Sequence, residues 1–153
     1  LATGGAVVSS KDYPTIDVAA LPLPAYDLIE PDQFARYSQI HEVGKIRYPA
    51  RSLHYRDIMT SRSCILRCSF CSVAHLRGPR QKYRRKSTAR VLAEVEQALG
   101  QGVEEIHFFD DLFAESEDQI LEFANTIIKR RINRIRHLET SNLTFVLTRR
   151  KLV

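Results

Sequence analysis

The chain has 153 residues, of which 44% are hydrophobic, and a formal net charge of +5. This composition supports one ordinary folded domain and excludes a disordered chain. The longest apolar runs, residues 18–23 and 106–109, fall far short of the roughly 20 residues that a membrane-spanning helix requires, so we expect a soluble, cytoplasmic protein without membrane contact. The surplus of Lys and Arg permits a nucleic-acid partner but does not favour one, because ordinary soluble surfaces often carry such a surplus.

Residues 1–50 differ from the rest of the chain, because they hold five of the six prolines and show no sustained helical or strand period. We interpret them as a linker. Residues 21–27 are expected to be extended, since proline restricts its own φ and that of the preceding residue, and a short helix is expected near residues 32–37. The chain begins with Leu1 and lacks the basic start and long apolar stretch of a signal peptide, so we expect a fragment that is cut at its front.

Residues 51–153 show alternating strand and helix signals, which predict an α/β domain with a parallel sheet. The first strand is expected at Arg56–Thr60. The first helix is expected to begin at Ser87 or Thr88 and to end at Gly100 and Gly102. Its apolar residues recur at helical spacing, at Val91, Leu92, Val95, Ala98 and Leu99.

The same unit then repeats. A short buried strand is predicted at Ile106–Phe109. A capping box of Ser116 and Gln119 opens a second helix, which ends near the basic run at residues 129–131. A third strand at Thr144–Thr148 would give three strands and two crossover helices.

Three cysteines, Cys64, Cys68 and Cys71, lie within eight residues, in a loop predicted to follow the first strand. An odd, clustered set is atypical of a secreted disulfide scaffold and indicates a metal centre in a reducing compartment. A four-iron cluster normally takes four thiolates, so three leave one iron open to a small molecule. Two alternatives remain on the residues alone: buried unreactive cysteines, or a structural zinc completed by His75. A zinc-stapled module of this kind would be a binding protein whose basic loop contacts nucleic acid.

The cysteine spacing, with Phe70 before the third cysteine, resembles the signature of the radical S-adenosylmethionine (radical SAM) superfamily. The wider context is most similar to members that carry an N-terminal cobalamin-binding domain, over about residues 12–128 of this chain. The family usually has Gly where Ser63 stands and often Pro where Ile65 stands. The matching segments are Leu21–Ile29, Thr60–Cys64, Arg84–Ser87, Glu94, Gly102 and Ile106–Phe113.

This resemblance implies a partial (β/α) radical SAM barrel: residues 1–50 would link it to a missing, cobalamin-binding domain, and residues 51–153 would form its N-terminal part. It also implies a 4Fe-4S cluster on the three cysteines, S-adenosylmethionine on the open iron, and a one-electron reductant such as flavodoxin or ferredoxin. Reductive cleavage of S-adenosylmethionine would give a 5′-deoxyadenosyl radical that abstracts hydrogen from a small-molecule substrate, for methyl transfer, cyclisation or rearrangement. Methylthio transfer to RNA or protein is an alternative that shares the cysteine spacing and the Arg77-Gly78 loop. The proline-rich linker and Phe109–Asp111 argue against it.

The resemblance further places Phe70 against the adenine, and Asp110 or Asp111 beside the amino group of S-adenosylmethionine. On the residues alone, Phe70 could simply pack at the base of the loop, and the two aspartates could form a turn. His107, in mid-strand, is expected to be a satisfied core histidine rather than a ligand. A run of six cations is expected to be a solvated loop, although it could bind an anion: Arg77, Arg80, Lys82, Arg84, Arg85 and Lys86.

Overall fold

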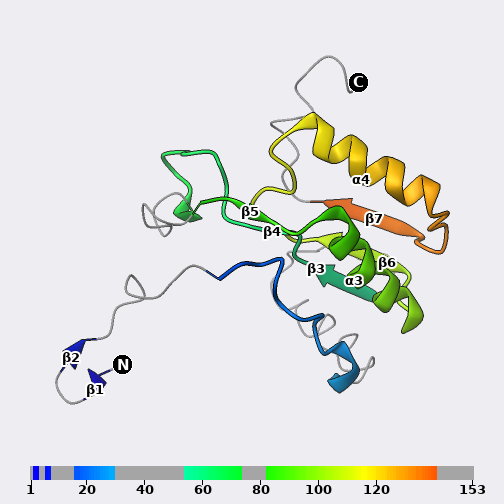
Figure 1. The fold of residues 1–153 in the computed structure, drawn as a ribbon, viewed down its shortest axis with the longest axis horizontal. Helices are drawn as coiled ribbons and strands as arrows, with labels where there is room; N and C mark the ends of the chain where they lie inside the picture. Colours follow the sequence, from blue (N-terminus) through cyan, green and yellow to red (C-terminus); the bar gives the residue numbers. More distant parts are fainter. Residues whose placement is uncertain (1, 4–5, 8–15, 30–53, 74–81, 141–153) are drawn as a thin grey trace, which may run out of the picture.

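The computed structural model describes residues 2–3, 6–7, 16–29, 54–73 and 82–140. Its central sheet is parallel and has the strand order β3-β6-β7, with β3 at Tyr55–Ile58, β6 at Glu105–Phe108 and β7 at His137–Thr140. Helix α3 (Thr88–Gly100) connects β3 to β6, and α4 (Glu117–Lys129) connects β6 to β7. Both helices lie on the same side of the sheet (Figure 1). The predicted α/β class is therefore confirmed.

The strands differ from their predicted positions in ways that have local causes. β3 ends two residues before the predicted Thr60, because the backbone N–H of Thr60 bonds to the Asp110 side chain and not to a strand. The predicted third strand at residues 144–148 lies outside the described residues. The third strand of the described sheet is β7, which comes earlier in the chain and carries too few apolar residues to give a clear strand signal.

The ends of α3 follow the sequence prediction closely. Ser87 caps its start, where the side-chain oxygen accepts a hydrogen bond from the backbone N–H of Arg90 at 3.2 Å. At the other end Gly102 adopts φ +83°, its N–H donates to the carbonyl of Leu99, and the N–H of Val103 donates to the carbonyl of Ala98. These two bonds form a Schellman motif, which satisfies the last carbonyl groups of the helix.

Helix α4 is capped in a related way. Ser116 accepts from the N–H of Gln119 at 3.4 Å, while the Gln119 side chain accepts from the N–H of Glu115 and not, as a strict capping box requires, from that of Ser116. At its C-terminus Arg131 takes the left-handed position with φ 52°, and the N–H of Ile132 donates to the carbonyl of Ile127. The same end motif therefore forms here without glycine.

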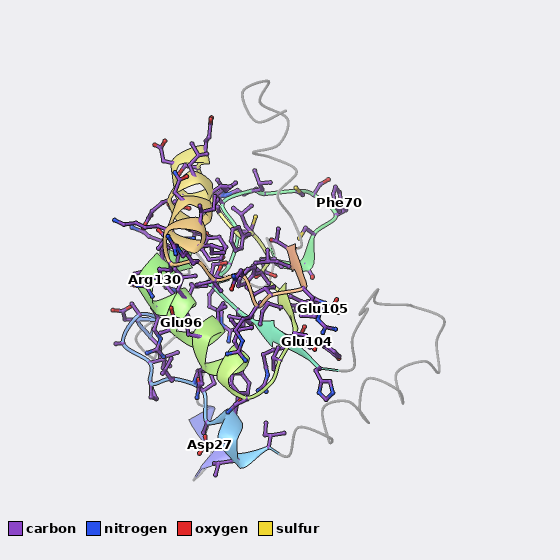
Figure 2. The ribbon with its side chains drawn as sticks, turned by 90° about the vertical axis from the view of Figure 1, so that its right-hand side faces the viewer. Asp27, Phe70, Glu96, Glu104, Glu105 and Arg130 are labelled. Carbon is purple, nitrogen blue, oxygen red and sulfur yellow. The ribbon has the colours of Figure 1, made fainter. Side chains whose placement is uncertain are left out.

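The core lies between the sheet and the two helices. Phe108, Phe113 and Phe123 form a triangle with ring centroids 5.1–5.3 Å apart, and all three are buried. An ion pair between Glu96 and Arg130, with Oε1 and Nη1 3.1 Å apart, joins the exposed surfaces of α3 and the end of α4 (Figure 2). No helix in the described ranges is long and apolar enough to cross a membrane.

Residues 16–29, which we call the strap, run beside β3 and α3. The Tyr26 hydroxyl donates to the carbonyl of Asp57 at 3.2 Å, and Gln97 of α3 donates to the carbonyl of Pro24 at 3.3 Å. The expectation of an extended chain over residues 21–27 is corrected at its end, because Tyr26–Leu28 form the 3-10 helix η2, closed by a bond from the N–H of Leu28 to the carbonyl of Ala25.

Two expectations for the N-terminal region are not tested by the described residues. The helix near residues 32–37 lies outside them, and the role of residues 1–50 as a linker stays a prediction. Within this region, β1 (Ala2–Thr3) and β2 (Ala6–Val7) form a short antiparallel pair.

Candidate metal centre

The cysteine loop leaves the sheet at the carboxyl end of β3 and is closed at its base by a small antiparallel ladder. β4 (Ser61–Arg62) precedes the cysteines and β5 (Arg84–Arg85) follows them, with Ser61 opposite Arg85 and Arg62 opposite Arg84. The two legs of the loop therefore start and end side by side. In parallel α/β folds, functional loops gather at this carboxyl edge of the sheet.

Asp110, two residues after the end of β6, holds the outgoing leg of the loop, which precedes the cysteines. Its Oδ1 accepts hydrogen bonds from the backbone N–H groups of Thr60 at 2.8 Å and Ser61 at 2.7 Å, and from the Ser61 hydroxyl at 3.1 Å. Its Oδ2 accepts from the Thr60 hydroxyl at 2.9 Å. Burial raises the pKa of Asp110, while these hydrogen bonds act in the opposite direction. The carboxylate thus ties β6 to the entry of the cysteine loop.

Ser63, immediately before the first cysteine, is buried and has φ 71°. This left-handed conformation is one that glycine adopts without steric cost. The chain therefore has at this position a backbone turn that Gly would favour, with a residue that is less suited to it.

The three cysteines are free and partly exposed. The backbone N–H of Leu66 donates to Sγ of Cys64 at 3.4 Å, and the N–H of Cys71 donates to the carbonyl of Cys68 at 3.1 Å. Among the residues that the structure describes, no three metal-ligating side chains are gathered into one site. His75, the fourth ligand of the zinc alternative, lies outside them.

The three residues predicted to contact S-adenosylmethionine differ in their exposure to solvent. Phe70 is 89% exposed and lies on the cysteine loop, away from the two helices (Figure 2). Asp111 is exposed, whereas Asp110 is buried and bonded to Thr60 and Ser61. The structure thus separates the two aspartates by environment. The contacts of all three residues with S-adenosylmethionine stay predictions.

The basic run is not a uniformly solvated loop over its described part. Arg84 donates to the carbonyl of Ile16 in the strap at 2.6 Å, and Arg85 donates to the carbonyl of Phe113 at 3.4 Å. Lys86 Nζ lies 2.8 Å from both carboxylate oxygens of Glu94. Lys82 is exposed, and Arg77 and Arg80 lie outside the described residues. Three of the six cations therefore serve internal contacts.

His107 of β6 is buried between two carboxylates. Its Nε2 lies 2.7 Å from Oε1 of Glu105 and its Nδ1 lies 3.4 Å from Oδ1 of Asp57, while its ring stacks on Tyr55. Hydrogen bonding to Asp57, and less strongly to Glu105, outweighs burial and raises the pKa of His107 to about 8. The expectation of a satisfied histidine is confirmed.

Sequence reasoning missed the residues that hold these groups, namely Thr60, Ser61, Asp57 and Glu105. The strand alternation offered a signal for Glu105 alone, because residues two apart in a strand, such as Glu105 and His107 in β6, share a face. Asp57 lies opposite His107 on the neighbouring strand β3, and the sequence alone does not give that register. The partners of Asp110 gave no such signal, since they lie about 50 positions away in the sequence.

The donor set fits an iron-sulfur cluster with one open iron. The three free thiols match the three thiolates that such a cluster would take from the protein. The N–H of Leu66 that points at Cys64 Sγ supplies the kind of hydrogen bond that tunes cluster sulfur. Binding would have to bring the three thiols together.

Comparison with known proteins gives one curated relative and a limited structural likeness. No family model matches the chain. It is 30% identical over 122 residues to an uncharacterized methyltransferase of Pyrococcus horikoshii, PH0819, which corresponds to 78% of this chain and 23% of that protein. The chain therefore spans less than a quarter of the length of this relative.

Among solved structures the chain is similar to part of TsrM, a radical S-adenosylmethionine methyltransferase from Kitasatospora setae. For TsrM with tryptophan substrate and aza-SAM bound, the TM-score is 0.48 at 27% identity over 55% of this chain and 16% of that one. For TsrM with cobalamin and a [4Fe-4S] cluster bound, the TM-score is 0.46 at 28% identity over 53% and 15%.

Proposed function

We propose that this chain contains the N-terminal part of a radical SAM core and that the complete protein is a methyltransferase. The observation that carries the proposal is the set of three free thiols within eight residues, on a loop that leaves the carboxyl end of β3. The relative PH0819 bears the name methyltransferase, which supports methyl transfer over cyclisation or rearrangement. The cobalamin-binding domain expected before the chain belongs to the same proposal.

In this proposal the residues of the chain bind and position. Cys64, Cys68 and Cys71 hold three irons as thiolates, and Asp110 fixes the loop entry through Thr60 and Ser61. A cluster bound there would supply the electron for reductive cleavage of S-adenosylmethionine, after receiving it from the one-electron reductant. Phe70, exposed on the loop, is available to contact the adenine. Asp111, exposed beside the buried Asp110, is the aspartate with access to an ammonium group from solution.

Anaerobic reconstitution with iron and sulfide tests the cysteine assignment. We expect about four irons and four sulfides per chain in the wild type. The variants Cys64→Ala, Cys68→Ala and Cys71→Ala should each lose most of this iron, because each removes one of only three protein ligands. Ser69→Ala, which changes an exposed residue within the same loop, should retain it.

Zinc binding distinguishes the proposal from a structural Cys₃His module. A chain that takes up one tight zinc, loses it in His75→Ala and never retains iron would contradict the enzyme proposal. Retention of the iron chromophore in His75→Ala would exclude the zinc module, since the cluster would not depend on the fourth ligand.

A further inference from the structure

Two buried carboxylates hold the two legs of the cysteine loop. Asp110 binds the outgoing leg at Thr60 and Ser61. The returning leg passes through β5 to Lys86, whose backbone N–H donates to the carbonyl of Thr60 at 2.8 Å. The side chain of Lys86 then reaches Glu94 of α3, with Nζ 2.8 Å from both carboxylate oxygens. The base of the loop is thus attached to β6 on one leg and to α3 on the other.

Glu94 is an unusual residue for its place in the fold. It is 1% exposed and lies in the buried stripe of α3, beside Val91 and Val95. Its Oε1 also accepts from Nε of Arg90 at 3.2 Å, so two cations surround one buried carboxylate. Burying charges costs solvation free energy, and a well-packed apolar side chain would serve core stability as well or better. What an apolar residue could not do is fix the ammonium group of Lys86.

We propose that Glu94 is a positioning residue for the cluster-binding loop: through Lys86 it fixes the returning leg against Thr60 and thereby the spacing of the three thiols. The inference rests on the proposed function where it concerns the bound cluster. Its geometric part concerns the metal-free loop and can be tested alone. Glu94 makes no contact with the cysteines and acts only through Lys86.

The first test measures how fast the three thiols of the metal-free, 153-residue chain react with dithiobis(nitrobenzoate) under anaerobic conditions. Glu94→Gln should increase the rate about tenfold, because a loop released on one leg opens more often. Glu96→Gln is the matched control: it removes an exposed carboxylate two residues further along the same helix and should leave the rate unchanged. Equal rates in the two variants would overturn the inference.

Lys86→Met gives a second route to the same answer. It keeps the Glu94–Arg90 pair, so it carries the comparison if Glu94→Gln unfolds the chain. The double variant, Glu94→Gln with Lys86→Met, should react no faster than the faster of the two single variants. Both substitutions break the same Lys86–Glu94 ion pair. Rates that multiply in the double variant would show two independent effects and contradict the proposed link.

The second test separates positioning from plain stability. In the reconstituted chain, Glu94→Gln should change the electron paramagnetic resonance spectrum of the reduced cluster and speed iron loss to a ferrous chelator, at temperatures well below the unfolding midpoint. An unchanged spectrum and an unchanged rate of iron loss would show that Glu94 contributes to stability alone and does not position the cluster-binding loop. If the wild type binds no iron while Glu94→Gln still speeds the reaction of the thiols, the proposed function is contradicted. The proposal that Glu94 fixes the returning leg of the loop through Lys86 is then supported on its own.

Discussion

Asp110 and His107 are buried ionisable residues three positions apart, His107 within β6 and Asp110 two residues after its end, and they have different roles. The carboxylate of Asp110 accepts hydrogen bonds from two backbone N–H groups and two hydroxyls at the entry of the cysteine loop. His107 bridges two carboxylates on adjacent strands. Each therefore makes its own measurable contribution, one to loop geometry and one to the pH dependence of folding.

Replacement of Asp110 by Asn should lower the free energy of unfolding by about 1–3 kcal/mol. The amide keeps one acceptor oxygen but presents N–H groups where the Thr60 hydroxyl now donates. Asp111→Asn, one residue further on and exposed, should change stability by less than about 0.5 kcal/mol. Urea unfolding of the metal-free chain measures both. Equal effects of the two variants would contradict the assigned role of Asp110.

The pKa of His107 makes stability depend on pH. The pKa is raised from 6.5 to about 8 by its carboxylate partners, so the protonated form favours the folded state. This contribution is fully present below about pH 6.5 and is lost as pH rises through about 8, with a loss on the order of 1–2 kcal/mol.

Denaturant unfolding between pH 6 and 9, in roughly half-unit steps, measures this slope. His107→Gln should remove it, whereas His54→Gln, at an exposed position, should preserve it. A slope that persists unchanged in His107→Gln would assign it to another group.

The two helices end in the same Schellman motif on different residues. At the end of α3 the left-handed position is Gly102, and at the end of α4 it is Arg131. A left-handed conformation costs a residue with a side chain roughly 1–2 kcal/mol. No atom lies within 4 Å of a Cβ placed on Gly102, so a substitution there is penalised through backbone conformation alone.

Reciprocal substitutions test this element-level account. Gly102→Ala should destabilise the chain by about 1 kcal/mol, and Arg131→Gly should stabilise it by about 0.5–1 kcal/mol. Arg131→Ala controls for the lost charge at the helix end and should bring no gain. Thermal unfolding monitored by circular dichroism gives all three values. A stabilisation by Arg131→Ala equal to that by Arg131→Gly would show that charge, not conformation, is decisive.

The sequence correctly predicted those elements that are specified by residues close together in the chain, such as helix caps and apolar spacing. The apolar spacing and the Ser87 and Gly102 caps located α3, and Ser116 located the start of α4. It did not locate β7, whose residues become a strand by pairing with β6 rather than by their own preference. The sequence did not predict the role of Glu94 in holding the cysteine loop for the same reason. Glu94 resembles an ordinary surface residue of a helix until the fold places Lys86 beside it.

At the scale of the whole molecule, the described sheet has three strands, and the cysteine loop, Asp110 and Glu94 meet at its carboxyl edge. The strap attaches to this unit by two hydrogen bonds: the Tyr26 hydroxyl donates to the carbonyl of Asp57 in β3, and Gln97 of α3 donates to the carbonyl of Pro24. The outgoing leg, the returning leg and the strap thus all join the first strand–helix–strand unit. This arrangement makes that unit the structural platform of the proposed cluster site.

Electron paramagnetic resonance of the anaerobically reconstituted and reduced chain, recorded with and without S-adenosylmethionine, tests the central claim most directly. The account predicts the signal of a reduced 4Fe-4S cluster whose g-values shift on addition of S-adenosylmethionine, because an iron without a protein ligand is free to bind it. A cluster signal that S-adenosylmethionine leaves unchanged, or a chain that takes up zinc and no iron, would contradict it.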